Sequence, residues 1–186
     1  MRLTIPRMAP DFNVTDIYGQ PIRLSGLRGR RVLVSFFREA GCPFCNIRCY
    51  ELTHHYKKWK EDGLVVIVFF RSDEADIHHF IASHPRPFSM VADPDMAHYQ
   101  TYEIEHSRWG LWRGVFLHGG RMLRGMRVGP IRASKDATLI PADFLIDEHG
   151  LIREAHYGRD IGDHIPLPRI ELFALEGRNR SRGRAA

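Results

Sequence analysis

A strand that leads directly into a pair of cysteines is the feature that most restricts the fold of this chain. Residues 32–37 are apolar, β-branched or aromatic almost throughout, which predicts a buried strand. A short polar turn then brings Cys42, Pro43, Phe44 and Cys45 to the start of a helix. Proline is tolerated there, because its missing N–H would have no partner in the first helical turn. The stretch therefore predicts a strand–turn–helix unit with a Cys-X-X-Cys motif at the helix N-terminus.

The position of the two cysteines predicts redox chemistry. A helix N-terminus leaves backbone N–H groups unpaired and carries a partial positive charge, which favours a thiolate over a thiol. We expect Cys42 to be exposed and to attack, and Cys45 to lie beneath it and to resolve the mixed disulfide or the sulfenic acid. Two buried, inert cysteines are the alternative. A zinc site is disfavoured, because the chain has no second cysteine pair.

Three nearby residues are harder to assign. Cys49 lies seven residues after Cys42, about 10 Å along the helix at ~1.5 Å per residue, which is too far for a disulfide. We expect it to be a buried core thiol. Arg38 would stabilise a Cys42 thiolate and Glu39 would oppose it, so the sequence leaves the sign of the pKa shift open. Both also fit solvated turn residues.

The remaining pattern predicts an α/β domain. The chain has 186 residues, of which 44% are hydrophobic and 26% charged, as in ordinary globular proteins. The order strand, helix, strand, helix after residue 31 favours parallel pairing. The expected elements are a hairpin over 12–24, helices over 43–62, 72–83, 93–102 and 166–175, strands over 64–70 and 88–92, and a hairpin of strands 139–147 and 151–156.

We expect a single domain over residues 1–175, followed by a basic, disordered tail over 176–186. The tail holds four arginines and one glutamate, so three of the five net positive charges belong to it. Nucleic-acid binding is not expected on this pattern, because no recognisable reading module accompanies the arginines. Residues 103–135 mix glycines with Trp, Met, Phe and Arg, and we interpret them as an insertion that packs its aromatic residues over the core.

No apolar run is long enough to span a membrane, and the N-terminus shows no apolar signal core, so a cytoplasmic protein is expected. The eleven histidines include two adjacent pairs, but neighbours on a helix point about 100° apart and do not share a metal. Residues 160–164 fit a turn or helix cap better than a cation site. No metal site is therefore predicted.

A proline at the start of a predicted central strand is the second unusual feature. Pro141 would remove a hydrogen-bond donor from the ladder. The conflict disappears if the bond between Ile140 and Pro141 is cis and forms a loop beside the cysteines. An edge-strand proline is the alternative.

Four short motifs, in order along the chain, support a family resemblance. They are Ala9-Pro10-Asp11-Phe12 with residues 16–24 and Leu27-Arg28-Gly29; VLVSFF followed by Gly41-Cys42-Pro43-Phe44-Cys45; Ile140-Pro141-Ala142-Asp143-Phe144-Leu145-Ile146-Asp147; and Gly150-Leu151-Ile152. Each motif alone is weak, but together they are specific. On these motifs residues 9–175 resemble a thioredoxin-fold protein of the AhpC/TSA (peroxiredoxin-like) superfamily, and the match is weakest over 103–135.

The resemblance implies a thioredoxin-like fold: a mixed central sheet flanked by helices, with an N-terminal β-hairpin, an insertion before the last hairpin, and a cis-proline facing the cysteines. Peroxiredoxins proper have a Pro and a Thr or Ser upstream of the reactive cysteine, and an Arg three residues before the Phe of a Phe-Ile-Asp strand. Here the turn at 38–41 has neither, and Pro141 stands at the position of that Arg. These departures favour thioredoxin-type exchange over peroxide reduction.

The leading hypothesis is a thiol-disulfide oxidoreductase that uses Cys42 and Cys45, with a substrate groove formed by Pro43, Phe44, Ile140 and Pro141. A peroxiredoxin-like thiol peroxidase with the same two cysteines and a non-catalytic binding protein on this fold are the alternatives. The expected substrates are protein disulfides or hydroperoxides, and the electron donor is a cellular thiol reductant. No cofactor, metal or membrane is expected, and an oligomer is possible.

Overall fold

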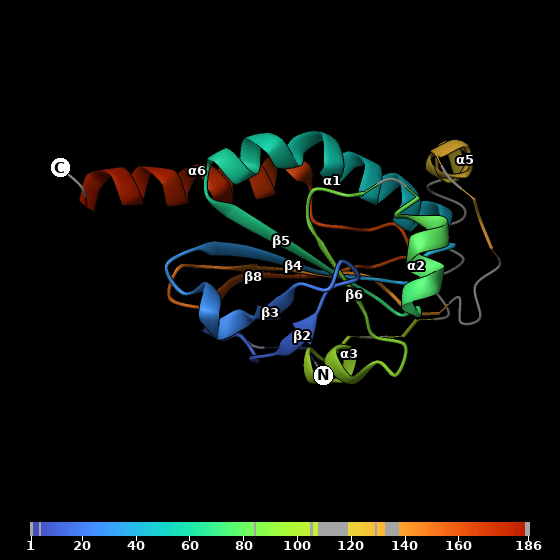
Figure 1. The fold of residues 1–186 in the computed structure, drawn as a ribbon. Coiled ribbons are helices and arrows are strands. Elements are labelled where there is room, and N and C mark those ends of the chain that lie inside the picture. Colours follow the sequence, from blue (N-terminus) through green and yellow to red (C-terminus); the bar gives the residue numbers. More distant parts are fainter. Residues whose placement is uncertain are drawn as a thin grey trace.

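The computed structural model describes residues 2–3, 5–83, 85–104, 106–107, 119–128, 130–132 and 138–184. Its elements are β1 (Arg7–Met8), β2 (Asn13–Thr15), β3 (Pro21–Arg23), η1 (Leu24–Leu27), β4 (Arg31–Phe37), α1 (Pro43–Glu61), β5 (Leu64–Phe70), α2 (Glu74–Phe80), β6 (Ser89–Ala92), α3 (Ala97–Thr101), α5 (Gly119–Val128), β7 (Ala142–Ile146), β8 (Leu151–Tyr157) and α6 (Leu167–Arg184). They form a six-stranded sheet and a separate two-stranded hairpin (Figure 1).

The sheet is mixed, with the strand order β1-β8-β7-β4-β5-β6. Strands β4, β5 and β6 run parallel to one another, whereas β7 is antiparallel to β4, and β8 is antiparallel to both β7 and β1. The parallel half comes from the strand–helix–strand units predicted by the sequence, and the antiparallel half from the last hairpin. The predicted α/β class with a thioredoxin-like mixed sheet is confirmed.

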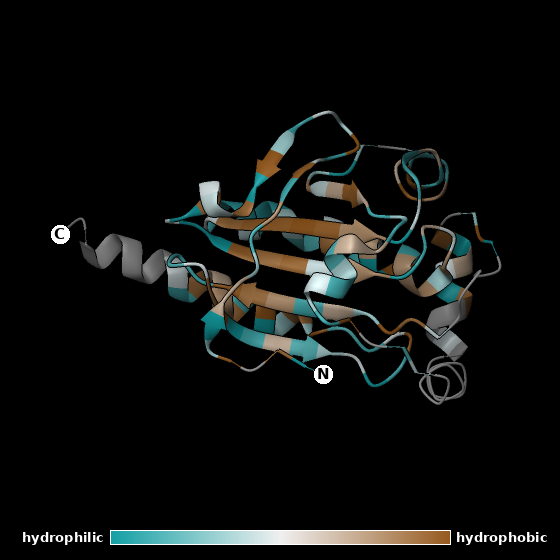
Figure 2. Ribbon diagram, turned by 90° about the horizontal axis from the view of Figure 1, so that it is seen from below, coloured by the Kyte–Doolittle hydropathy of each residue, from teal (hydrophilic) through white to brown (hydrophobic). Residues whose placement is uncertain are grey.

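Both faces of the sheet are covered, because the central strands are apolar on both sides. In β4, Leu33 and Phe37 pack into the cluster that holds residues of α1, α2 and α6. Val34 and Phe36 pack into the opposite cluster, which includes α3 and the hairpin formed by β2 and β3. Figure 1 shows α1 and α6 on one side of the sheet, and Figure 2 shows that the central strands are mainly hydrophobic. The sheet therefore holds the end of β4 in a fixed place, and the cysteines follow it.

The region before β7 differs from the expectation. The strand begins at Ala142 rather than at residue 139, so Pro141 lies just outside the ladder and removes no donor from it. The bond between Ile140 and Pro141 is trans; in the described part of the chain the cis peptide bond is Ile5–Pro6. The prediction of a cis-proline at this site is wrong, because the strand starts one residue after the proline and leaves no conflict to resolve.

The last helix also differs from the expectation. It was predicted to end at residue 175 with a disordered tail after it, but α6 continues as a helix to Arg184 (Figure 1). Arg31 on β4 anchors the middle of this helix: its Nη1 donates to the carbonyl oxygen of Phe173 at 2.6 Å and lies 3.3 Å from the carboxylate of Glu176. The residues beyond contain arginine and no proline, so the helix can continue past this anchor.

Part of the predicted insertion is described. The prediction that aromatic residues of 103–135 cover the core concerns mainly residues 108–118, which lie outside the described residues. The described part contains α5, a helix that the sequence pattern did not predict. It packs against the beginning of α1, at the same end of the molecule as α2 (Figure 1).

Among the described helices, none is long and apolar enough to cross a membrane.

Candidate active site

The turn between β4 and α1 delivers Cys42 to the helix N-terminus. Cys42 is the N-cap residue of α1, with φ −77° and ψ 124°, and Pro43 is in the first helical turn, as predicted. The backbone N–H of Arg71, just after β5, donates to the carbonyl of Arg38 at 2.9 Å. The N–H of Ala40 donates to the hydroxyl of Ser72 at 3.0 Å. The cysteine turn is thus tied to the end of the neighbouring central strand.

The surroundings of Cys42 stabilise its thiolate. A hydrogen bond from the thiol of Cys45 is the largest cause, and the positive charge of Arg38 and the backbone N–H groups of Cys45 and Phe44 act in the same direction. Nη1 of Arg38 lies 3.3 Å from Sγ of Cys42. Together they outweigh the opposing effect of burial and lower the pKa of Cys42 from 9.0 to about 6. At neutral pH the group is a thiolate.

The structure resolves the competition between Arg38 and Glu39 that the sequence left open. Arg38 is buried and directed at Cys42, whereas the carboxylate of Glu39 lies 3.6 Å from the guanidinium of Arg71. An opposite charge at that distance balances Glu39, so the acidic residue is paired with a cation of its own. Neither residue is a solvated turn residue, because both are buried.

The other two cysteines are thiols. Burial, the hydrogen bond to Cys42 and the negative charge of Cys42 raise the pKa of Cys45 well above its ordinary value. Burial raises the pKa of Cys49 to about 12. Cys49 is fully buried in the cluster that contains α1, which agrees with the prediction of a core thiol. All three cysteines are free.

The predicted exposure of Cys42 is wrong. Cys42 is only 3% exposed and Cys45 only 1%, so both thiols lie below the surface. The residues predicted to form the groove are also covered, except for the half-buried Pro43. Phe44 and Ile140 belong to the same buried cluster as the two cysteines, and Pro141 is buried beside Ile140. Among these residues, Pro43 alone is partly open to solvent, and the cysteine pair is closed.

A buried polar network lies on the same face of the sheet, and sequence reasoning did not find it. Asp143 on β7 pairs in register with Ser35 on β4 and accepts a hydrogen bond from its hydroxyl. The same carboxylate lies 3.1 Å from Nδ1 of His164 and accepts from the N–H of Ile165 at 2.7 Å. Although burial opposes ionisation, His164, the charge of Arg48 and Ser35 hold the pKa of Asp143 well below its usual range. The signal available in the sequence was a lone Asp within an apolar strand.

Arg48 connects this network to the cysteine helix. It lies one turn after Cys45 on α1, and its Nη2 donates to the carbonyl of Ile165 at 2.7 Å. The loop 160–164, which the sequence assigned to a turn, has that structure: Asp160 accepts from the N–H of Gly162 at 3.0 Å. Within the described residues, no group of three or more potential metal ligands gathers.

Comparison with known proteins places the chain in a family. Residues 5–155 match the model of the AhpC/TSA family. The chain is 27% identical over 172 residues to the "Putative peroxiredoxin" of Mycobacterium tuberculosis (strain ATCC 25618 / H37Rv). The aligned region covers 92% of this chain and 96% of that protein. It is 30% identical over 105 residues to the thiol-disulfide oxidoreductase ResA of Bacillus anthracis, covering 55% of this chain and 60% of ResA.

Solved structures agree on the fold. The crystal structure of peroxidoxin BcpB from Mycobacterium tuberculosis superposes with a TM-score of 0.63 at 14% identity, over 94% of this chain and 96% of that one. At such identity the likeness concerns the fold alone. The family match, by contrast, covers most of the chain, including β4, both cysteines of the motif and the strand β7. The chain belongs to the AhpC/TSA family.

Proposed function

We propose that this protein is a thiol-disulfide oxidoreductase in which Cys42 is the nucleophile and Cys45 the resolving thiol. The observation that carries the proposal is the opposite perturbation of the two thiols: the pKa of Cys42 is lowered and that of its neighbour is raised. A stable thiolate beside a protonated thiol is the ground state that two-step exchange requires.

The geometry accounts for the order of the two steps. The Cys42 thiolate attacks one sulfur of a substrate disulfide, a Cys42–substrate disulfide forms, and the other substrate sulfur leaves as a thiolate. Cys42 then no longer carries a negative charge, so two of the causes that raise the pKa of Cys45 disappear. Cys45 now loses its proton to the leaving thiolate, attacks the Cys42 sulfur and releases the reduced substrate. The product is a Cys42–Cys45 disulfide.

Regeneration requires two electrons from a cellular thiol reductant, which returns both cysteines to the dithiol state by the reverse exchange. We place this cycle in the cytoplasm, because three clustered free thiols suit a reducing compartment. Trapping the cysteines with an alkylating reagent in intact cells tests this placement: a mainly reduced pair is expected, and a mainly oxidised pair contradicts it.

The substrate groove is proposed to consist of Pro43, Phe44, Ile140 and Pro141. Phe44 and Ile140 belong to the same buried cluster as the two cysteines, which supports the proposal, and the four residues would present an apolar surface to the chain that carries the disulfide. Since Phe44 and Ile140 are each 3% exposed, the groove has to open before it binds a substrate.

Cysteine variants test the main proposal. Cys42→Ser should abolish the reduction of an insulin disulfide by a dithiol, and Cys45→Ser should accumulate mixed disulfides that mass spectrometry detects. Cys49→Ser is the matched control, because this thiol is buried with a pKa of about 12 and should not take part. Full activity in Cys42→Ser would exclude the proposed mechanism.

A thiol peroxidase is the second candidate, and the peroxiredoxin relatives together with Arg38 beside Cys42 favour it. The Cys42 thiolate would attack a hydroperoxide oxygen, giving a sulfenic acid and an alcohol, and Cys45 would then form the disulfide with loss of water. Stopped-flow oxidation by hydrogen peroxide separates the two functions. A reaction no faster than that of a free thiol excludes the peroxidase. A non-catalytic binding protein would instead have a cysteine pair that cellular reductants cannot cycle.

A further inference from the structure

A cap formed by residues 119–128 and 130–132 covers the cysteine turn. It consists of α5 and the short segment that follows, and it lies against the N-terminal end of α1 (Figure 1). The amide Nδ2 of Asn46, one residue after Cys45, donates to the carbonyl of Pro130 at 2.9 Å. The N–H of Arg132 donates to the carbonyl of Gly41 at 3.0 Å. The cap thus contacts the chain on both sides of Cys42.

Two glycines allow this close approach. A Cβ atom on Gly125 of α5 would lie 2.0 Å from the carbonyl oxygen of Pro43, closer than atoms can approach. A Cβ atom on Gly41 would lie 2.8 Å from Cβ of Arg132 and 3.0 Å from its backbone nitrogen. The backbone of the cap therefore lies directly against the residues immediately before and after Cys42, and Cys42 between them is only 3% exposed.

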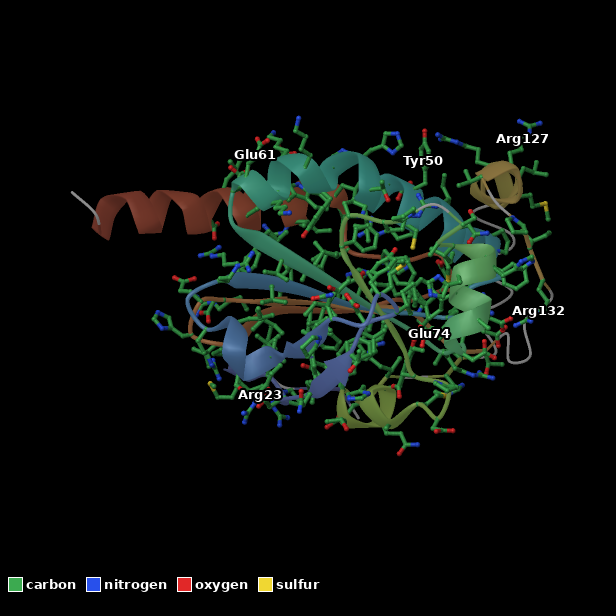
Figure 3. All side chains as sticks on the ribbon, viewed as in Figure 1. Arg23, Tyr50, Glu61, Glu74, Arg127 and Arg132 are labelled. Atoms are coloured by element: carbon green, nitrogen blue, oxygen red, sulfur yellow. The ribbon has the colours of Figure 1, made fainter. Side chains whose placement is uncertain are left out.

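An ion pair joins the cap to α2. Both guanidinium Nη atoms of Arg132 bond the two carboxylate oxygens of Asp76 on α2, with the Nη1–Oδ1 distance at 2.9 Å. The guanidinium also lies 5.0 Å from the ring centroid of Phe80 on the same helix. Figure 3 shows Arg132 beside α2. The side chains of Arg132 and Asp76 remain 39% and 20% exposed, so water and salt reach the pair.

We infer that the cap is a gate that sets which disulfides reach Cys42, with the Arg132–Asp76 pair as its latch and protein disulfides as the substrates that require it to open. This inference rests on the proposed role of Cys42 as nucleophile. Exchange needs the three sulfur atoms nearly in line, so the incoming disulfide must approach Cys42 from outside. A small disulfide needs only a slight displacement of the cap, whereas a disulfide within a protein brings a bulky backbone and needs the cap to leave the turn.

The latch is of moderate strength, as a gate requires. An exposed ion pair together with a cation–π contact corresponds to about a three- to twentyfold shift in the population of the open cap. The pair is also screened by salt, because both groups are in contact with water. The latch therefore slows substrate access without preventing it.

The test measures two rates on the reduced full-length protein: alkylation of Cys42 by iodoacetamide, followed by mass spectrometry, and reduction of insulin disulfides. Arg132→Gln is expected to raise both rates, and the insulin rate more, by about three- to twentyfold. Rising salt should speed alkylation of the wild type and leave that of the variant unchanged. Asp76→Asn should behave like Arg132→Gln, and the double variant should gain no more than either single one.

Two further variants complete the test. Gly125→Ala should open the cap with the latch residues intact, because its Cβ displaces α5 from Pro43. Arg169→Ala is the matched control, since it removes an exposed ion pair with Glu154 on β8, away from the cap. Unchanged rates in Arg132→Gln and Gly125→Ala would overturn the gate, whether or not the protein reduces insulin. Faster alkylation with no insulin reduction in any variant would support the gate and refute the proposed function.

Discussion

Replacing Arg38 by methionine tests the origin of the Cys42 thiolate. The pKa of about 6, against an ordinary value of 9.0, corresponds to roughly 4 kcal/mol of preference for the charged form. A hydrogen bond to a charged group contributes roughly 1.5–3 kcal/mol of such a preference. Without the guanidinium, the pKa of Cys42 should therefore rise to between about 7 and 8. The hydrogen bond from Cys45 remains and keeps the value below 9.0.

The titration can be followed without removing the other cysteines. Cys45 and Cys49 have raised pKa values, so the thiolate absorbance that appears below pH 9 belongs to Cys42. In the wild type the absorbance and the iodoacetamide rate should reach half their plateau near pH 6. At pH 7 about 90% of the wild type is thiolate, whereas at a pKa near 7.5 only about a quarter is.

Arg71→Met provides the matched control. It removes an arginine of the same region whose partner is the carboxylate of Glu39, at 3.6 Å, and not Cys42. Its effect on the Cys42 titration should be smaller than that of Arg38→Met. Arg38→Lys should keep part of the shift, since the charge remains. A midpoint in Arg38→Met equal to that of the wild type would refute the electrostatic argument for this site.

Three further variants test the scaffold. Asp143→Asn should destabilise the fold by roughly 3 kcal/mol in urea titrations, because His164 loses its buried partner. Because folding lowers the pKa of Asp143, the ionised carboxylate stabilises the fold above its unfolded pKa near 4, and this stabilisation is lost as the pH falls further. If acid destabilised the Asn variant as much as the wild type, this role of Asp143 would be contradicted. Leu52→Ala should cost roughly 2–5 kcal/mol, since this side chain is fully buried; a loss below about 1 kcal/mol would contradict the packing. Asp73→Ala should cost about 1 kcal/mol and speed amide exchange at Asp76, whose N–H it caps at 2.7 Å, and unchanged exchange there would argue against the cap.

Local patterns were sufficient for the elements around the cysteines. The strand over 64–70 has the bounds predicted from its apolar run, and α1 begins at Pro43 as the proline and the cysteine pair indicated. Both features depend on residues that are neighbours in the sequence, so they can be predicted from one sequence. The start of β7 was missed by three residues, because an apolar run continues through Leu139 and Ile140 outside the ladder.

The sequence by itself determined the fold class, the helix-start position of Cys42 and Cys45, and the core position of Cys49. Only the tertiary structure decided how Cys42 is charged and how it is reached. The charge depends on which of Arg38 and Glu39 faces the sulfur. Arg38 does, whereas Glu39 pairs with Arg71, which lies just after β5. Access depends on a cap that begins at residue 119, far along the chain from Cys42. Electrostatic forces and steric exclusion act through space, so both properties require residues that are distant in sequence to be placed together.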